Sequence, residues 1–575
     1  MSGRRTSPSP KAPAPLATAG PIARWELVAL VLVVAATLAV YWPVRSFEFV
    51  NYDDNQFIFD NPRMQEGLSL RNAGWAFTVA IAANWHPLTT LTHLIDCSVF
   101  HLDAGGHHLT SLLIHLLNVV LLYLLLRRLT VSAGAGLLVA ALFALHPVNV
   151  ESVAWISERK NVLSQLFFFL TLWAYAGYAR SGSRRSFAVA LALFAAGLMS
   201  KAMLVSVPAV LLLLDLWPLG RASLASARTA LRDLVRLLPE KLPFVALSLA
   251  ASVLTVVTQR EVDALPDLRH FPLATRLANA AVSYLAYVGD LFAPVHLAVC
   301  YQVVGIEAWR SLGAAALLVA ASAVAWLQRL RRPYLLVGWA WYLVTLVPVI
   351  GVVQVGSQAR ADRYAYLPLI GLFLVLALLA EEAAGWLRAP RTALWAAGGV
   401  LLLGLSPVTR RQVLVWHDDQ ALWQHALGSV KGAYVAYNGL GMLHAKQHKL
   451  AEAAKDFEAA VAINPEYYDA WNNLGQVKLE QNDLEAAVGY YRKALRYKRS
   501  SPKALNNLGT CLARQGHFTE AAGFYEEALG LDPEYVNARS NYARALSALG
   551  RADEANVQLQ KVEESRRRAE QRGAR

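Results

Sequence analysis

The chain has 575 residues, of which 56% are hydrophobic, and its mean hydropathy is +0.34. This length is too great for one domain, and the composition places most of the chain in a membrane. The formal net charge of +13 does not indicate a nucleic-acid partner, because many Lys and Arg residues fall in short loops between apolar runs, as the positive-inside rule expects. Cys97, Cys300 and Cys511 are few and scattered, so they predict neither a disulfide framework nor a metal site.

The N-terminal residues are basic and rich in Ser, Pro and Ala, which predicts a disordered cytoplasmic tail over 1–24. The apolar run that follows, residues 25–45, ends in Tyr41-Trp42-Pro43 and has no small-residue cleavage site. It therefore predicts a retained membrane anchor rather than a cleaved signal peptide.

Apolar runs separated by basic loops continue to about residue 408, and they predict an all-α, polytopic membrane domain over 25–408. Run length and charge bias give about eleven crossings and an external C-terminus. We expect crossings at about 25–45, 107–126, 131–146, 161–179, 186–199, 203–219, 243–259, 310–328, 334–352, 366–386 and 392–408.

Residues 276–300 are apolar enough to insert, but they contain Asp290 and Pro294. If this segment crossed alone, the basic residues around Arg331 would fall outside, against the charge rule. We therefore expect a re-entrant or interfacial helix here.

The first external loop carries two adjacent carboxylates, Asp53 and Asp54, a few residues past the first crossing. A soluble loop would hold such a pair equally well. The neighbours Tyr52, Phe57 and Phe59 suit a bilayer interface, and ionisable residues at membrane boundaries are candidates for function. Because successive side chains of an extended segment face opposite ways, we expect only one of the two to enter a site. Both are catalytic candidates, and we expect substitution of Asp53 to be severe and substitution of Asp54 to be milder.

Other loops predicted on the same side repeat this placement of charges at helix ends. The residues concerned are His86, Glu151, Arg159, Lys160, Lys201, Asp362 and Arg363. Each could instead be an interfacial anchor, and Lys201 could extend harmlessly to the membrane surface. Their common side favours one site, and cations beside carboxylates suit a phosphate-bearing ligand. The histidines match no compact metal-ligand spacing, so we predict no metal site and leave a divalent cation open.

The C-terminal part, residues 434–568, contains a repeat of 34 residues. The first three copies align Tyr437, Leu440, Gly441, Ala453, Phe457 and Ala460 with Trp471, Leu474, Gly475, Ala487, Tyr491 and Ala494, and with Leu505, Leu508, Gly509, Ala521, Tyr525 and Ala528. Small residues let two helices cross closely and large ones fill the gap, which is the tetratricopeptide pattern. We expect about four repeats in an α-solenoid, a connecting helix over 409–433 and a disordered tail over 569–575.

Four motifs and the repeats occur here in a characteristic order. They are the acidic pair, His146-Pro147 with Glu151, Ser200-Lys201, and Asp362-Arg363-Tyr364 with Tyr366-Leu367-Pro368. In this order they resemble the transmembrane and tetratricopeptide-repeat O-mannosyltransferase-like proteins of the GT-C glycosyltransferase superfamily, from about residue 25 to 565. The chain departs from the family in two respects. Animal members usually carry Glu-Arg where this chain has Asp362-Arg363, and the repeats here are few.

The resemblance implies an inverting transferase. Such an enzyme moves a mannose-like sugar from a polyprenyl-phosphate carrier to a protein or glycan acceptor on the non-cytosolic face. It implies a general base at Asp53 or Asp54 and cations that stabilise the departing phosphate. Glu151 would support the acceptor or sugar. Arg159, Lys160, Lys201 and Arg363 are the phosphate-side candidates, and His86 and Asp362 complete the predicted substrate-binding set.

Two other function classes stay open. A non-catalytic scaffold would recruit partners through the repeats, and a transporter would line a path with its charges. For the transferase we expect a bacterial inner membrane with the repeats on the periplasmic or external side. The lipid bilayer and a lipid-linked sugar would then be partners, and a protein could bind the repeats.

Overall fold

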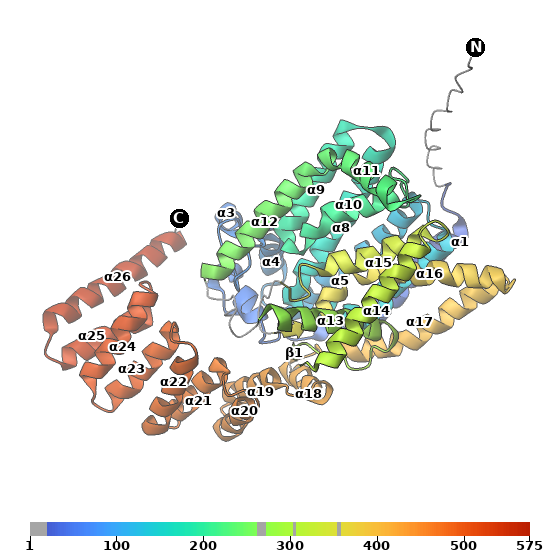
Figure 1. Ribbon diagram of the computed structural model, residues 1–575. Coiled ribbons are helices and arrows are strands. Elements are labelled where there is room, and N and C mark those ends of the chain that lie inside the picture. Colours follow the sequence, from blue (N-terminus) through green and yellow to red (C-terminus); the bar gives the residue numbers. More distant parts are fainter. Residues whose placement is uncertain (1–19, 262–271, 303–305, 353–357, 575) are drawn as a thin grey trace, which may run out of the picture. The chain divides into compact units, whose positions relative to one another are not determined.

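The computed structural model describes residues 20–261, 272–302, 306–352 and 358–574, so most of the tail expected over 1–24 lies outside the described residues (Figure 1). The chain divides into two compact units, Met1–Leu422 and Trp423–Arg575. Helices make up nearly all the regular structure that is described in both.

The helices of unit 1 are α1 (Arg24–Tyr41), α2 (Pro62–Gln65), α3 (Leu70–Ala76), α4 (Pro87–Phe100), α5 (Ala104–Arg128), α6 (Ala133–Leu145), α7 (Val150–Ala154), α8 (Arg159–Ser181), α9 (Arg184–Ser200), α10 (Val207–Leu216), α11 (Ala227–Leu237), α12 (Leu242–Glu261), α13 (Leu273–Phe292), α14 (Ala308–Leu327), α15 (Pro333–Leu346), α16 (Leu369–Trp386) and α17 (Arg391–Leu414). Shorter helical turns are η1 (Trp42–Ser46), η2 (Asn55–Phe59), η3 (Pro147–Asn149), η4 (Ile156–Glu158), η5 (Ala202–Ser206), η6 (Leu238–Glu240) and η7 (Asp362–Ala365).

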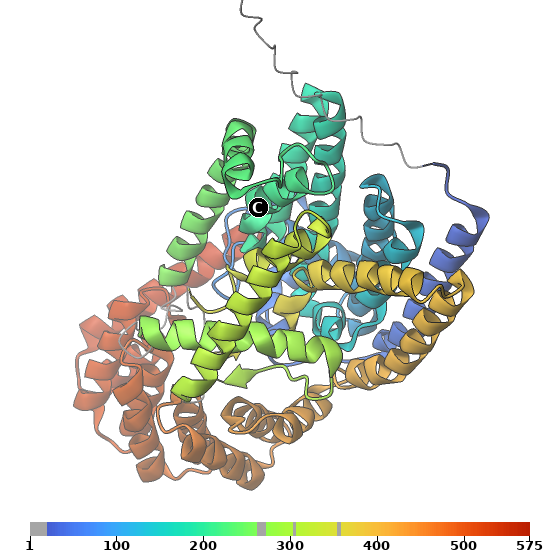
Figure 2. The same cartoon turned by 45° about the vertical axis from the view of Figure 1, so that its right-hand side comes forward.

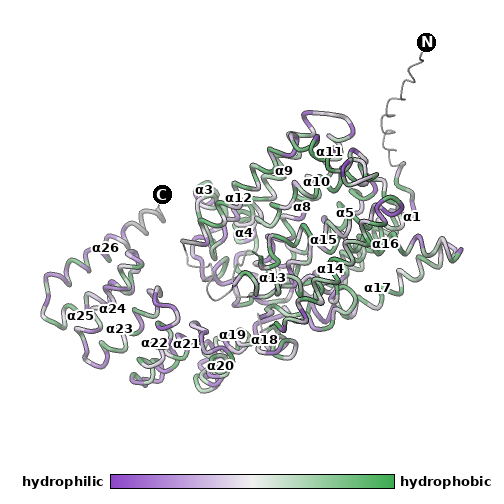
Figure 3. The backbone as a smooth tube through the Cα atoms, viewed as in Figure 1, coloured by the Kyte–Doolittle hydropathy of each residue, from purple (hydrophilic) through white to green (hydrophobic). Residues whose placement is uncertain are grey.

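Seven helices of the described residues are long and apolar enough to span a membrane. These candidate spans are Arg24–Ser46, Ala104–Arg128, Ile156–Ser181, Leu242–Gln259, Ala308–Leu327, Leu369–Trp386 and Thr392–Leu414. The bent pair Ala133–Leu145 and Pro147–Ala154 could add an eighth. Figure 3 shows hydrophobic stretches along the long helices of this unit, whereas hydrophilic residues are frequent along the repeat helices of unit 2.

The expected number of eleven crossings is therefore not confirmed. Residues 186–199, 203–219 and 334–352 fold as α9 (17 residues), η5 with α10, and α15 (14 residues). Each of these helices is shorter than the roughly 20 residues that span a bilayer. Hydropathy counts apolar residues but does not register where a helix breaks. The helix α13 covers most of 276–300 and is not among the seven.

The first and last candidate spans, α1 and α17, run parallel to each other, and Figure 2 shows them side by side. At one end the rings of Trp25 and Trp395 meet at 5.1 Å between centroids. At the other end Arg410 Nη1 donates to the Ala39 carbonyl at 2.9 Å. If both helices cross the membrane, the number of crossings from α1 to α17 is odd, whatever its value.

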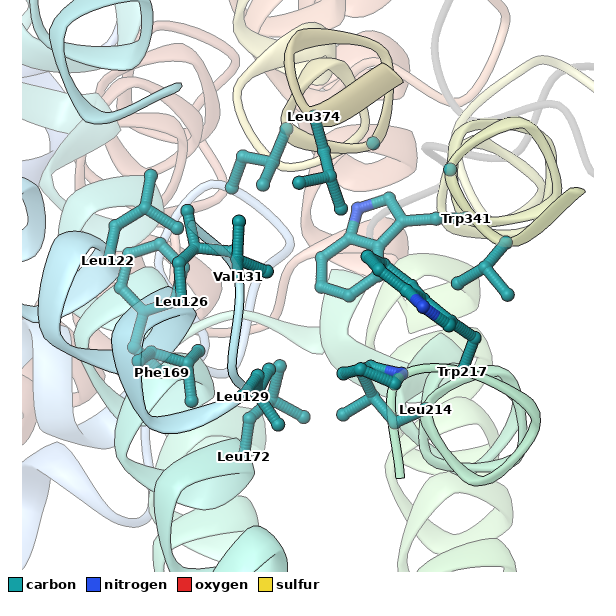
Figure 4. Close-up of a pocket in the computed structure, with 16 residues that line it drawn as sticks. Leu122, Leu126, Leu129, Val131, Phe169, Leu172, Leu214, Trp217, Trp341 and Leu374 are labelled. Carbon is teal, nitrogen blue, oxygen red and sulfur yellow. The ribbon is translucent and has the colours of Figure 1, made fainter. Parts of the chain in front are cut away.

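Where α5, α8, α15 and α16 pack together, the interior of unit 1 is apolar and closely packed. Gly338 of α15 and Gly371 of α16 face each other, and a Cβ on either would collide with the other's carbonyl oxygen. Such small residues let membrane helices approach closely. Figure 4 shows Leu126, Phe169 and Trp341 among the side chains around a small apolar cavity of about 30 Å³.

A short antiparallel strand pair departs from the all-α prediction. β1 (Tyr301–Gln302) pairs with β2 (Gln358–Arg360), and Tyr301 lies opposite Arg360. Strands this short carry no periodic signal in the sequence. The pair matters because β2 leads directly into η7, which carries Asp362 and Arg363.

Within the range predicted as one connecting helix, 409–433, α17 continues to Leu414 and a separate helix, α18, spans Asp419–Ser429. The residues around 417–419, between these two helices, contact the segment that follows α1. The Glu48 backbone N–H donates to the His417 carbonyl at 2.9 Å, and the Asn51 N–H donates to Asp419 Oδ1 at 2.6 Å. The chain thus leaves α17 beside the acidic segment.

Unit 2 consists of helix pairs in the tetratricopeptide arrangement. They are α19 (Tyr434–Lys446) with α20 (Leu450–Ile463), α21 (Tyr468–Glu480) with α22 (Leu484–Tyr497), α23 (Pro502–Arg514) with α24 (Phe518–Leu531), and α25 (Val536–Ala548) with α26 (Ala552–Ala574). A Cβ on Gly475 would lie 2.7 Å from the Tyr491 ring, and one on Gly509 would lie 2.8 Å from the Tyr525 ring. The glycine thus makes room for the large ring of the second helix. The helix α26 includes most of the range predicted as a disordered tail, 569–575.

Candidate active site

Asp54 anchors the acidic segment to the turn before α8. Its carboxylate accepts the Val50 backbone N–H at 3.1 Å and the Ser157 backbone N–H at 3.0 Å, and the Ser157 hydroxyl also donates to it. The side chain is fully buried. Burial raises the pKa of Asp54 to about 7, although the hydrogen bonds from Ser157 and Val50 act in the opposite direction. Asp54 is therefore held by the protein's own donors.

Asp53 is different, because it is half-buried and its carboxylate has no hydrogen bond or ion pair with any described residue. Burial raises the pKa of Asp53, while the positive charges of Lys160 and Arg363 lower it. The expectation of an extended segment was wrong, since Asp54, the residue just before η2, has helical φ −59° and ψ −27°. The two side chains still diverge, because neighbours on a helical turn differ in direction by about 100°.

Glu158, at the start of α8, holds three cations from three parts of the chain. Lys201 Nζ lies 2.9 Å from Glu158 Oε2, while Lys160 Nζ and Arg363 Nε lie 3.1 Å and 3.5 Å from Oε1. Lys201 also donates to Asn161 Oδ1 at 2.6 Å. All three cations are less than a tenth exposed. We call these four charged residues the Glu158 cluster.

Arg363 is fixed by both its side chain and its backbone. Its Nη1 donates to Glu151 Oε1 at 2.6 Å, and its backbone N–H donates to Glu151 Oε2 at 2.8 Å. The Arg363 carbonyl accepts Asn161 Nδ2 at 3.0 Å. These contacts join η7 to α7 and α8, so they place the guanidinium beside the Glu158 cluster.

Asp362 points into a different environment from Arg363. Its carboxylate accepts the Tyr301 hydroxyl at 2.9 Å and the Ala298 backbone N–H at 3.1 Å. Burial, together with the charge of Glu151, raises the pKa of Asp362 well above its usual range. Its partners follow α13 in the chain, and Asp362 ties that segment to η7.

An aromatic stack covers one side of the cluster. The Trp155 ring lies between Tyr52 and Trp416, with centroid separations of 5.2 Å and 5.4 Å and interplanar angles of 25° and 20°. The Arg363 guanidinium lies 5.3 Å from the Trp155 ring centroid, and Lys160 Nζ lies 5.2 Å from that of Phe57. Such cation–π contacts hold charges in an otherwise apolar wall.

Comparison with known proteins gives matches to both units. Residues 93–239 match the family described as dolichyl-phosphate-mannose-protein mannosyltransferase, and residues 438–536 and 512–575 match tetratricopeptide-repeat families. The resemblance to the transmembrane and tetratricopeptide-repeat O-mannosyltransferase-like proteins is confirmed. The chain is a multi-pass membrane protein with tetratricopeptide repeats.

Several proteins named protein O-mannosyl-transferase are similar to this chain. Human TMTC1 is 26% identical over 497 residues, which is 76% of this chain and 55% of that protein. Human TMTC3 is 28% identical over 167 residues (28% and 18% of the two chains), and Drosophila melanogaster Tmtc2 is 30% identical over 168 residues (26% and 18%). The chain thus spans about half the length of TMTC1. Among solved structures, MamA covers 26% of this chain and 88% of its own, at 18% identity and a TM-score of 0.25.

Arg159 is the one phosphate-side candidate that lies outside the Glu158 cluster. It is fully buried and pairs with Asp96 Oδ2 at 2.5 Å. Its Nη2 donates to the His107 carbonyl at 2.6 Å and its Nε to Ser111 Oγ at 3.2 Å. Arg159 therefore ties α8 to α4 and α5, and we give it a structural role.

His86 lies at the start of α4, near the Glu158 cluster. Burial, and then the charges of Lys160 and Lys201, lower the pKa of His86 to about 3. Across the described ranges of the chain, no group of three or more His, Cys, Asp or Glu side chains is placed to hold a metal ion.

The sequence shows Glu158 beside Arg159 and Lys160, but sequence reasoning assigned no role to Glu158, Asn161 or Ser157. All three lie in the segment that carries Glu151 and Lys160, and their only signal was that a polar stretch interrupts two apolar runs. Their roles depend on Arg363 and Asp54, which are remote in sequence, so no local pattern could assign them.

Proposed function

We propose that this chain is a membrane glycosyltransferase that moves a mannose-like sugar from a polyprenyl-phosphate carrier to a protein or glycan hydroxyl on the non-cytosolic face. The match of residues 93–239 to a mannosyltransferase family supports the reaction class. The proposed location of the active site is supported by charged residues that come together there from separate segments, namely Asp53, Lys160, Lys201 and Arg363.

One observation carries the assignment of the base. Among the acidic residues of this region that the structure describes, Asp54, Glu151, Glu158 and Asp362 are all bonded to donors or cations. The carboxylate of Asp53 has no such partner among the described residues and is only partly exposed. Its lone pairs are thus free to accept a proton, and a pKa raised by burial brings a carboxylate closer to the range of an effective base.

The reaction then follows from these groups. The acceptor hydroxyl gives its proton to Asp53 while its oxygen attacks the anomeric carbon from the face opposite the carrier. The bond from that carbon to the phosphate oxygen breaks, and the electron pair leaves with the polyprenyl phosphate. Lys160, Lys201 and Arg363 stabilise the negative charge that develops on the phosphate. Because the cluster is largely buried, these charges act at low dielectric, where they are stronger than in water.

The repeats offer a surface for a protein acceptor or partner, as tetratricopeptide solenoids form extended concave binding surfaces. We place them on the same side of the membrane as Asp53. This placement is supported by the parallel course of α1 and α17 and by the hydrogen bonds of Glu48 and Asn51 to residues 417 and 419.

The deciding experiment is transfer by the purified full chain in lipid nanodiscs. The protein would be given polyprenyl-phosphate-linked mannose and, separately, the glucose analogue, and release of the lipid phosphate would be followed with and without Ser/Thr-rich peptides. We expect release that depends on the mannose donor and increases with acceptor. No release with either sugar, by protein that is folded, would favour the non-catalytic scaffold.

A further inference from the structure

The first turn of α4 has backbone donors that make no hydrogen bond with the described residues. α4 is 14 residues long and begins at Pro87, with His86 as a residue before it that makes no capping hydrogen bond. The leading N–H groups of a helix have no partner within it, and at α4 these belong to Leu88 and Thr89, since Pro87 has none. Such groups and the helix dipole favour an anion.

His86 gives a second and independent indication of a ligand. Its side chain is only 6% exposed, and its Nδ1 atom has no hydrogen-bond partner among the described residues. A buried polar atom without a partner is costly, and such atoms are rare unless a water, an ion or a ligand satisfies them. With its pKa lowered to about 3, His86 is neutral near pH 7, and one of its ring nitrogens carries a proton that it can donate.

Two lysines complete the surroundings. Thr89, in the first turn of α4, donates from Oγ1 to the Ser200 carbonyl at 2.9 Å, so this turn packs against the residue before Lys201. Lys201 uses two of its three ammonium donors on Glu158 and Asn161. Lys160 uses one on Glu158. Donors therefore remain on both lysines for an added anion.

The charges around His86 and Asp53 differ in an informative way. Of the nearby cations, Lys160 lowers the pKa of both His86 and Asp53 the most. Lys201 also lowers the pKa of His86, and Arg363 also lowers the pKa of Asp53. Lys160 also lies 5.2 Å from the ring centroid of Phe57 in η2, the turn that follows Asp53, and it shares Glu158 with Lys201. Lys160 therefore connects the segment that carries Asp53 to the lysine beside the first turn of α4. A base on one side and a leaving group on the other is what an inverting transfer requires.

We propose that the first turn of α4, His86, Lys160 and Lys201 form the subsite for the phosphate of the lipid-linked donor, with the sugar extending from it toward Asp53. This proposal rests on the proposed function for the identity of the donor. The chemistry recognised is a phosphate ester, which a phospholipid headgroup could also supply.

The test is binding without transfer. The full chain in phosphatidylcholine nanodiscs is titrated with farnesyl phosphate, and with farnesol as the uncharged control. We expect Lys201→Met and His86→Phe to weaken farnesyl phosphate about tenfold or more, as for a lost charge-assisted hydrogen bond, and to leave farnesol unchanged. Lys201→Arg should keep most of the affinity. Arg45→Met, which removes an exposed cation on the turn after α1, should bind as wild type.

The outcomes separate the alternatives. Wild-type affinity in Lys201→Met, or equal losses in Lys201→Arg and Lys201→Met at matched melting temperature, would overturn the subsite. Equal competition by phosphatidylglycerol would overturn its assignment to the donor and identify a headgroup site. If wild type binds farnesyl phosphate with the expected variant pattern but releases no phosphate from any lipid-linked sugar, the subsite stands and the proposed function fails.

Discussion

Arg363 Nη1 lies 2.6 Å from Glu151 Oε1, although the two residues are separated by 212 positions in the chain. The pair joins η7, which follows the short strand pair, to α7, which follows the bend after α6. Both side chains are less than a tenth exposed. A second bond from the Arg363 backbone to the same carboxylate fixes the direction of the pair.

Breaking this pair should destabilise unit 1. Glu151→Gln leaves the Arg363 charge buried without its full counter-charge, and Arg363→Met does the same to Glu151. Loss of one partner of a buried pair typically costs about 3–5 kcal/mol. We expect the melting temperature of each single variant to be several degrees below that of wild type. The double variant should lose less than the sum of the two single losses. Melting of the purified protein in detergent measures this coupling, and strictly additive losses would show that the pair contributes nothing.

Substitutions at the two adjacent carboxylates should have different effects, on turnover at Asp53 and on stability at Asp54. Asp53→Asn keeps the shape and removes the base, so turnover should fall about 10²–10⁴-fold with an unchanged melting temperature. Asp54→Asn should instead lower the melting temperature, because an amide replaces part of the acceptor set that holds Ser157 and Val50. The matched control is Asp60→Asn, which changes an exposed carboxylate on the same segment. Wild-type turnover in Asp53→Asn would remove it from the mechanism.

Asp54 should make stability depend on pH. Its pKa is about 7 in the folded protein against about 3.9 in an unfolded chain. Between these values the folded state binds more protons, so stability falls as pH rises from about 4 to about 7. The melting temperature of wild type should therefore drop across this interval, and the slope should be smaller in Asp54→Asn. An identical slope in both proteins would assign the effect to other groups.

The topology can be checked with reporters. Fusions after Arg185 and after Arg332 should report the cytoplasm, as their basic surroundings predict. Fusions after Glu66 and after Pro465 should report the opposite side, and should agree with each other because α1 and α17 run parallel. If the reporters at Glu66 and Pro465 disagree, α1 and α17 do not both cross, and the repeats do not share a side with Asp53.

The repeats should tolerate change only where the helices leave space. Gly475→Leu would drive a side chain into the Tyr491 ring, whereas Gly489→Leu enters open space on the exposed face of α22. We expect the first variant to become sensitive to proteolysis in residues 434–574 while unit 1 stays inserted, and the second to resist cleavage as wild type does. Loss of membrane insertion in Gly475→Leu would contradict independent folding of the two units.

The sequence by itself determined the features that depend on composition and on short repeats. Apolar runs such as those of α1 and α5 are long enough to require a membrane, and the 34-residue period of Gly441, Gly475 and Gly509 requires paired helices. The positions of Asp53 and Arg363 at helix ends were also visible, because hydropathy changes abruptly there.

Only the tertiary structure decided which of these residues meet. Arg159 and Lys160 are neighbours in sequence, yet Arg159 faces Asp96 and Lys160 faces Glu158, because adjacent positions on a helix point in different directions. Asp53 and Asp54 differ for the same reason. The breaks within the apolar helices and the strand pair before η7 also escaped the sequence, since helix breaks and pairings between remote segments are set by packing and hydrogen bonds that no local pattern records.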